Sequence, residues 1–167
     1  SLVISKGQFE RTAQGPMRHT GNELDVALEG PGYFAVTTPN GTMYTRAGNF
    51  SLGVNGELVT ASGMTVEGEG GGGITIPADA REVKITSAGD IVTDQGAVGR
   101  LSITEFENPQ LLQPQGNGLY RVPEGVASTP SESTQAVQGF IEGSNVQPIF
   151  EMTRMIDVSR AYQRTQQ

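Results

Sequence analysis

Cysteine and tryptophan are absent from this 167-residue sequence, and histidine occurs once, at His19. Without cysteine, neither disulfides nor thiolate metal sites can form, so packing must hold the core together. A Ser-His-Asp triad cannot be built around an isolated histidine, and no Gly-x-Ser-x-Gly motif is present. We therefore expect His19 to be a surface residue, and we expect no metal, no cofactor and no enzymatic activity.

Long apolar runs and an excess of basic residues are also lacking. No stretch approaches the ~18 apolar residues of a membrane span, and the apolar run within residues 1–7 is too short for a secretory signal peptide. The formal net charge is −7, whereas proteins that bind nucleic acid or anionic membranes carry basic patches. We expect no nucleic-acid partner, no membrane insertion and no small-molecule substrate.

Glycine, in contrast, is abundant. It contributes 23 of the 167 residues, about twice the ~7% average, and most glycines lie between short runs of β-type residues. Asn40-Gly41, Asn55-Gly56 and Ser62-Gly63 each separate two such runs, and Asn-Gly is a strong hairpin signal. The composition is that of an all-β domain with tight turns, in which we expect Gly48, Gly56 and Gly63 to hold positive φ.

The β-type runs cover much of the chain between residues 24 and 143. We expect residues 24–28 and 33–37 to pair across a turn at 29–32, and the antiparallel meander to continue to residue 66. Further strands are expected at 74–77, 83–86, 91–93, 100–106 and 136–141. Residues 122–134, which are rich in Pro, Ser and Thr, are expected to form a surface loop.

The last thirty residues show a different pattern. Ser144 or Asn145 can cap a helix after Gly143, and Asn145 places Pro148 in the first turn, where a missing N–H is tolerated. Apolar residues then recur at helical spacing in two neighbouring rows, and nothing stops the helix before Gln167. The face could dock on the chain's own domain or on a partner. As a protein interface it comprises Ile149, Met152, Met155, Ile156, Ser159 and Tyr162.

Three local groupings resemble functional sites, and each has a simpler structural interpretation. The glycine-rich segment 67–73 lacks the Lys-Ser/Thr and the helix of a phosphate loop, so we expect a mobile surface loop. Asp90 and Asp94 lack the ligand register of a calcium loop and are expected to be turn residues. Glu105 and Glu107 could mimic the carboxylate pair of a glycosidase, but strand alternation favours a solvated face.

Several blocks of the sequence resemble the bacterial flagellar rod and hook family. One block runs from Thr20-Gly21-Asn22 through Leu24-Asp25-Val26-Ala27, Gly30, Gly32 and Phe34 to Tyr44-Thr45-Arg46, Gly48 and Phe50. The C-terminal block contains Gln138-Gly139, Glu142, Ser144-Asn145-Val146, Glu151, Met155-Ile156 and Arg160-Ala161-Tyr162. Gln147 and Gln163 depart from the family's usual Asn and Glu. Ser159, where many members carry Gln, is more similar to the proximal-rod F type.

The resemblance implies a structural subunit of the flagellar basal-body rod that self-assembles into the axial drive shaft for motility. The expected fold is mainly β, a compact antiparallel domain of many short strands, Greek-key or barrel-like, with a C-terminal α-helix. Residues 1–23 would be an extended lead-in from a missing N-terminal helix, 24–143 the β domain, and 144–167 a truncated coiled-coil-type helix. The chain would then be a trimmed fragment.

The resemblance also implies a location and partners. The subunit would leave the cell through the flagellar type III export apparatus without a cleaved signal peptide. It would reside in the basal body, where the rod spans the periplasm, and contact the same and neighbouring axial proteins.

Two alternatives stay open. The chain could be a distal-rod or hook subunit of the same family, although hook subunits usually carry a further inserted domain. It could also be a secreted β-rich module that binds a glycan. Such a module needs a cleft with several exposed aromatic side chains, and the sequence offers four Tyr and no Trp.

Overall fold

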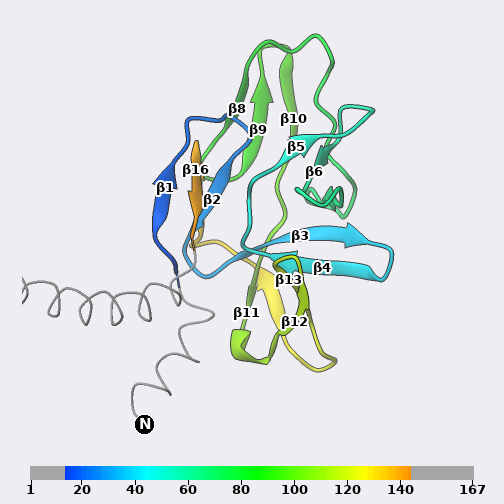
Figure 1. Ribbon diagram of the computed structural model, residues 1–167, viewed down its shortest axis with the longest axis vertical. Coiled ribbons are helices and arrows are strands. Elements are labelled where there is room, and N and C mark those ends of the chain that lie inside the picture. The colour runs from blue at the N-terminus through cyan, green and yellow to red at the C-terminus, as the bar shows by residue number, and fades with distance from the viewer. Residues whose placement is uncertain (1–13, 144–167) are drawn as a thin grey trace, which may run out of the picture.

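The computed structural model describes residues 14–143 (Figure 1). Within this range the chain is mainly β, and every strand pairing is antiparallel. The mainly β, antiparallel class expected from the sequence is therefore confirmed. The expected C-terminal helix lies outside the described residues. No helix between residues 14 and 143 has the length and apolar character needed to cross a membrane.

Sixteen short strands and one 3₁₀ turn make up the described chain. Their bounds are Met17–His19 (β1), Val26–Glu29 (β2), Tyr33–Thr38 (β3), Gly41–Thr45 (β4), Ser51–Leu52 (β5), Leu58–Val59 (β6), Thr65–Val66 (β7), Val83–Ile85 (β8), Asp90–Thr93 (β9), Gly96–Arg100 (β10), Ile103–Phe106 (β11), Pro109–Leu111 (η2), Gln113–Gly116 (β12), Leu119–Arg121 (β13), Ser128–Pro130 (β14), Gln135–Gln138 (β15) and Phe140–Glu142 (β16).

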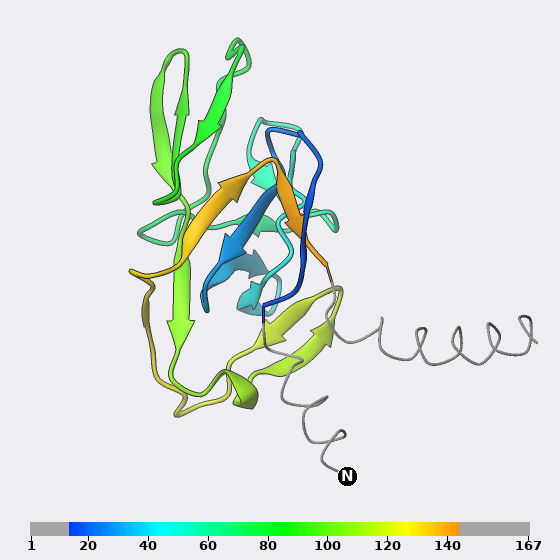
Figure 2. The same cartoon turned by 90° about the vertical axis from the view of Figure 1, so that its left-hand side faces the viewer.

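The strands form four sheets. The largest runs β12-β13-β4-β3-β7-β6-β5, with β11 pairing both β3 and β14. The other three are β10-β9-β8, β15-β2 and β1-β16. In Figure 2 the β8–β10 sheet projects at one end of the molecule and the β12–β13 hairpin lies at the other. The path of the largest sheet ends at β12 and β5, so the described strands form several open sheets and no closed barrel.

One large hydrophobic cluster lies where these sheets meet. Its members come from nearly every part of the described chain, including β2, β3, β6, β8, β9 and β11. A smaller cluster of Tyr33, Phe106 and Leu112 packs on the opposite side of β3. Strand β3 therefore has buried side chains on both faces, which is why Tyr33 to Val36 are buried without alternation.

The expected pairing of residues 24–28 with 33–37 is wrong. Strand β2 pairs with β15, and β3 pairs with β4, β7 and β11. The chain passes from one sheet into another between β2 and β3. Glycine is needed at Gly30 and Gly32 in this connection, because a Cβ at either residue would lie within 3.0 Å of Thr134. Residues 26–28, covered on both faces, are fully buried.

The three hairpin turns predicted from Gly-containing pairs are confirmed. Thr38 pairs with Gly41, Leu52 pairs with Leu58, and Val59 pairs with Thr65. Gly56 and Gly63 hold φ of 85° and 89°, as expected. Gly48 is not among the glycines with positive φ, so its expected role is wrong. A Cβ there would lie 1.7 Å from the carbonyl oxygen of Val26, so close backbone approach requires glycine at this position.

Other differences concern where strands begin and end. The expected strand at 136–141 is broken at Gly139, which has φ 86° and separates β15 from β16. The expected strand at 100–106 is divided between β10 and β11. The expected loop at 122–134 contains β14, which pairs with β11. Residues 74–77 form only an isolated bridge, although Ile74 and Ile76 are buried in the core.

Candidate functional site

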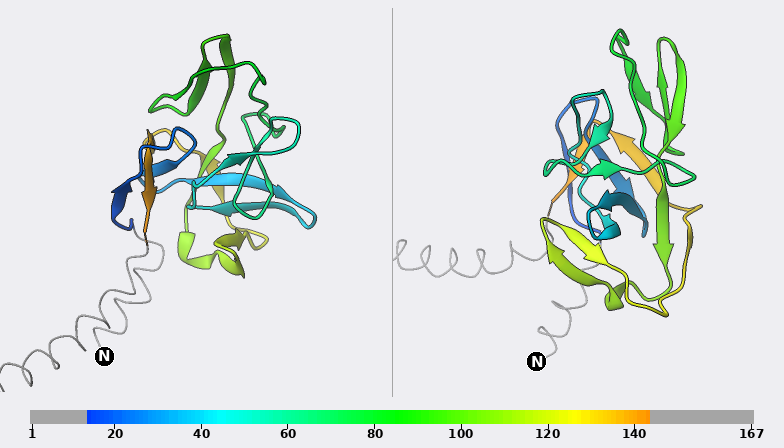
Figure 3. Two further views of the ribbon diagram at one scale, coloured as in Figure 1. Left: turned by 45° about the horizontal axis from the view of Figure 1, so that its top comes forward. Right: turned by 90° about the vertical axis from the view of Figure 1, so that its right-hand side faces the viewer.

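The two ends of the described chain meet on one side of the molecule. Strand β1 near the N-terminal end pairs with β16 near the C-terminal end, with Arg18 opposite Ile141. The two strands lie side by side in Figures 1 and 3. The Gly143 N–H donates to the Pro16 carbonyl oxygen at 2.8 Å, which extends the pairing to the last described residue. Residues 17–19, within the expected lead-in, are thus part of the sheet structure.

Arg46, which follows β4, connects these ends to the body of the domain. Its guanidinium donates to the Glu142 carboxylate through Nε at 3.0 Å and through Nη2 at 3.2 Å. Nη2 also donates to Oε1 of Gln14 at 3.1 Å. We call Arg46, Gln14 and Glu142 the clasp. One side chain between β4 and β5 therefore bonds to both ends of the described part of the chain.

The same guanidinium also fixes the connection between β2 and β3. It donates to three backbone carbonyl oxygens, those of Leu28, Gly30 and Gly32. The six hydrogen bonds of Arg46 thus join three separate segments of the chain. Because carbonyls of a redirected chain cannot all pair within a sheet, a planar cation with five N–H groups suits this position.

The clasp is largely shielded from water. The side chains of Arg46 and Glu142 are 18% and 7% exposed. The second oxygen of Glu142 accepts a hydrogen bond from the Gly15 N–H at 2.6 Å. The Arg46 guanidinium carbon lies 5.8 Å from the centre of the Tyr33 ring. Because partial burial strengthens charge-assisted hydrogen bonds, the Arg46–Glu142 pair stabilises the fold more than an exposed surface ion pair does.

Tyr33 itself is a buried aromatic residue beside the clasp. Its ring makes edge-on contacts with Phe106 and Tyr120, at centroid distances of 5.6 and 5.9 Å. Burial raises the pKa of Tyr33 to about 12, although the positive charge of Arg46 opposes the rise. The phenol therefore stays neutral at ordinary pH and acts as a packing residue.

Gln138, the last residue of β15, joins the β15–β2 sheet to the sheet that contains β8. Its side-chain amide accepts from the Ile85 N–H at 3.1 Å and donates to the Val83 carbonyl at 2.8 Å. It thereby pairs with the edge of β8 as a backbone strand would. The amide also donates to the Glu23 carbonyl at 2.8 Å. The sequence placed Gln138 in a motif without showing this role.

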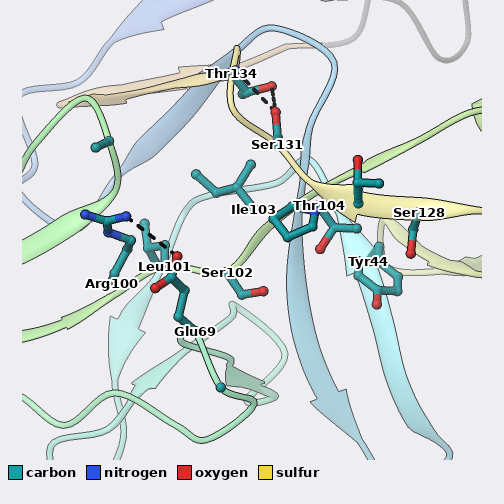
Figure 4. Close-up of a pocket in the computed structure, with 14 residues that line it drawn as sticks. Tyr44, Glu69, Arg100, Leu101, Ser102, Ile103, Thr104, Ser128, Ser131 and Thr134 are labelled. Atoms are coloured by element: carbon teal, nitrogen blue, oxygen red, sulfur yellow. Dashed lines mark hydrogen bonds and ion pairs between the residues drawn. The ribbon is translucent and has the colours of Figure 1, made fainter.

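A hollow of about 450 Å³ lies elsewhere, beside β11 and β14 (Figure 4). Its lining is mainly hydroxyl side chains and backbone, with Tyr44 as the single aromatic residue. The two charged residues that line it, Arg100 and Glu69, face each other with 3.7 Å between nitrogen and oxygen. No acid and base converge there on a shared point, and one aromatic ring does not make the glycan cleft considered above.

Three of the carboxylates singled out from the sequence, Asp90, Asp94 and Glu105, have hydrogen-bond partners. Asp90 accepts from Arg100 Nε at 2.7 Å, and this guanidinium holds the pKa of Asp90 below its usual value. Asp94 accepts from the N–H groups of Arg81 and Glu82, which lower its pKa. Glu105 accepts from Ser131 Oγ at 3.1 Å. His19 is exposed, as predicted, and its ring lies 5.0 Å from that of Phe140.

The six interface residues predicted from the sequence lie outside the described residues. They are Ile149, Met152, Met155, Ile156, Ser159 and Tyr162. The clasp was not predicted as a unit, because nothing in the sequence shows that residues 14, 46 and 142 meet. The only available signal was a charged residue, Arg46, between two β-type runs.

Comparison with known proteins gives matches along most of the chain. Residues 27–93 match a family model described as the D1 domain of the flagellar hook protein FlgE/F/G. Residues 137–167 match one described as the C-terminal part of the flagellar basal body rod FlgEFG protein. The two matched segments contain Arg46 and Glu142, respectively.

Individual relatives are similar over nearly the whole chain. A flagellar basal-body rod protein FlgF of Caulobacter vibrioides is 39% identical over 164 residues, which are 97% of this chain and 66% of that protein. A FlgF of Mesorhizobium japonicum is 37% identical over 99% of this chain and 69% of its own length. A FlgG of Bacillus subtilis is 42% identical over 86% of this chain and 59% of its own length. The chain thus spans about two thirds of the lengths of these relatives.

Proposed function

The chain belongs to the family of flagellar hook and basal-body rod proteins, and on this basis we propose that it is a structural, non-enzymatic subunit of the flagellar basal-body rod. The observation that carries the proposal is the match to named rod proteins over 97% and 99% of the chain. The described domain fits a structural role, since the hollow beside β11 and β14 brings no acid and base together on a shared point.

Within the rod we propose the F type and a proximal position. Two of the relatives with the broadest coverage of this chain carry the name FlgF, which supports the F type. The FlgG of Bacillus subtilis, with 42% identity over 86% of the chain, keeps a distal-rod subunit as the second candidate. Its partners would be the same and neighbouring axial proteins. The flagellar type III apparatus would export the subunit, which would assemble where the rod spans the periplasm.

We propose that assembly uses the segment that follows β16. The apolar face of Ile149, Met152, Met155, Ile156, Ser159 and Tyr162 would contact neighbouring subunits as a helix. Support comes from the helical spacing of these residues and from the family match that extends from residue 137 to 167. The pairing of β1 with β16 supports an arrangement in which both terminal segments leave the β domain together.

Deletion of the gene in its own host tests the proposal. Cells without the protein should be non-motile, and basal bodies isolated from them should lack a complete rod. The wild-type gene should restore both, and an epitope tag in the exposed loop at residues 70–72 should label the rod in electron micrographs of isolated basal bodies. Normal motility of the deletion strain, or a tag found elsewhere than on the axial structure, would refute the rod assignment.

A further inference from the structure

We propose that Arg46 is a positioning residue that fixes the direction in which both terminal segments leave the β domain, and that this fixed direction is required for assembly. The inference rests on the proposed rod function. It assigns a role in assembly to a residue of the β domain, far in sequence from the expected helical interface.

The first support is the position of Arg46 among the segments it joins. It bonds to Gln14 on the N-terminal side and to Glu142 on the C-terminal side, while its other bonds go to the β2–β3 connection. Glu142 in turn accepts from the Gly15 N–H at 2.6 Å. Loss of the guanidinium therefore removes a bond from each end of the described chain at once, while Gln14 keeps its bonds to the Leu28 carbonyl and the Gly30 N–H.

The second support is that the hydrophobic core does not hold the two end strands. No residue of β1 or β16 belongs to the buried hydrophobic clusters. The two strands form a sheet of their own, and an isolated two-stranded ribbon is marginal in water. Polar contacts must therefore hold the ribbon, and the least exposed ion pair of the described residues is the one between Arg46 and Glu142.

The third support is the directionality of the contacts. A guanidinium that binds a carboxylate through two nitrogens fixes orientation as well as distance, and lysine cannot reproduce this geometry. The two ends of the described part of the chain are also in close contact, since a Cβ on Gly15 would lie 1.9 Å from the Gly143 carbonyl oxygen. The clasp thus sets one exit direction for two segments that leave as a unit.

Hydrogen exchange on the 167-residue chain provides the first test. We compare Arg46→Met and Glu142→Gln with the matched control Arg100→Met, since Arg100 also binds a carboxylate through two nitrogens, but at the remote β9–β10 sheet. Both clasp variants should raise exchange of the Gly15 and Gly143 amides at least tenfold. The amides of Phe34 and Val36 in β3 should exchange as in the wild type, and Arg100→Met should leave all four unchanged. If either clasp variant exposes the β3 amides as well, Arg46 holds the core and the positioning role is wrong.

Assembly in the host is the second test. Arg46→Met and Arg46→Lys, in the complete gene product, should abolish swimming, whereas Arg100→Met should not. Hydrogen exchange of the Phe34 and Val36 amides in the purified variants shows whether a subunit that fails to assemble still has a folded β domain.

Two different outcomes would overturn the rod assignment and the positioning role of Arg46. Failure of the wild-type gene to restore swimming would overturn the proposed function itself. Swimming by both Arg46 variants would overturn only the positioning role.

Discussion

At the scale of single residues, the glycines of this chain serve different purposes that the sequence does not distinguish. Gly56 and Gly63 were correctly expected to hold positive φ, because Asn-Gly and Ser-Gly between β-type runs are local turn signals. Gly48 was misjudged, because its constraint comes from Val26, a residue of another strand. A steric requirement imposed by a distant segment leaves no local pattern in the sequence.

The contrast between Gly48 and Gly72 gives a stability prediction. Gly48→Ala would push a methyl group to within 1.7 Å of the Val26 carbonyl oxygen, so we expect a loss of roughly 3 kcal/mol or more. At Gly72 a Cβ would meet nothing within 4 Å, and Gly72→Ala should change stability by less than about 0.5 kcal/mol. Urea unfolding of both variants checks this. Equal midpoints for the two would contradict the close approach at Gly48.

Tyr33 gives a prediction about alkaline pH. Its pKa is about 12 in the folded chain, above the ordinary value of 10.0, chiefly because of burial. Between these values the unfolded chain has lost a proton that the folded chain keeps, so the free energy of unfolding should fall as pH rises. The share due to Tyr33 is about 2 kcal/mol by pH 12, and Tyr33→Phe should remove it. Parallel stability curves for the wild type and the variant above pH 10 would argue against the raised pKa.

At the scale of elements, hairpins were predictable and sheet partners were not. The turns at Gly41, Gly56 and Gly63 follow from two or three adjacent residues. The partner of β2 is β15, more than a hundred residues later, and no local signal identifies it. The same reason explains why the clasp was missed, since its three residues become neighbours only through β1–β16 pairing and the path of β2 and β3.

Gln138 allows the attachment between two sheets to be tested. Gln138→Leu keeps the bulk of the side chain but leaves the Ile85 N–H and the Val83 carbonyl without the amide. We expect a loss of about 1–3 kcal/mol, together with faster exchange of the Ile85 amide. The exposed Gln115→Leu serves as the matched control, with an expected change below about 0.5 kcal/mol. If the Ile85 amide keeps its protection in Gln138→Leu, the side-chain pairing with β8 is not what joins the sheets.

At the scale of the whole molecule, charge is divided unevenly between the domain and its ends. Residues 14–143 carry 15 acidic and 6 basic side chains, whereas the remaining residues carry 3 acidic and 5 basic ones, which accounts for the total of −7. Copies of the β domain would therefore repel one another weakly, while the terminal segments carry no such excess of negative charge. This distribution fits assembly through the terminal segments, with the domain held at a fixed direction by the clasp.

We propose that the segment after β16 builds the rod and that the β domain folds independently of it. In the complete gene product, Met152→Asp combined with Ile156→Asp would place two unpaired charges in the proposed helix–helix interface, each at a cost of several kcal/mol. The most direct measurement combines swimming of cells that carry this double variant with hydrogen exchange of the purified protein. We predict non-motile cells without complete rods and unchanged exchange in β2, β3 and β15. Motile cells, or a β domain whose amides lose their protection, would contradict the claim.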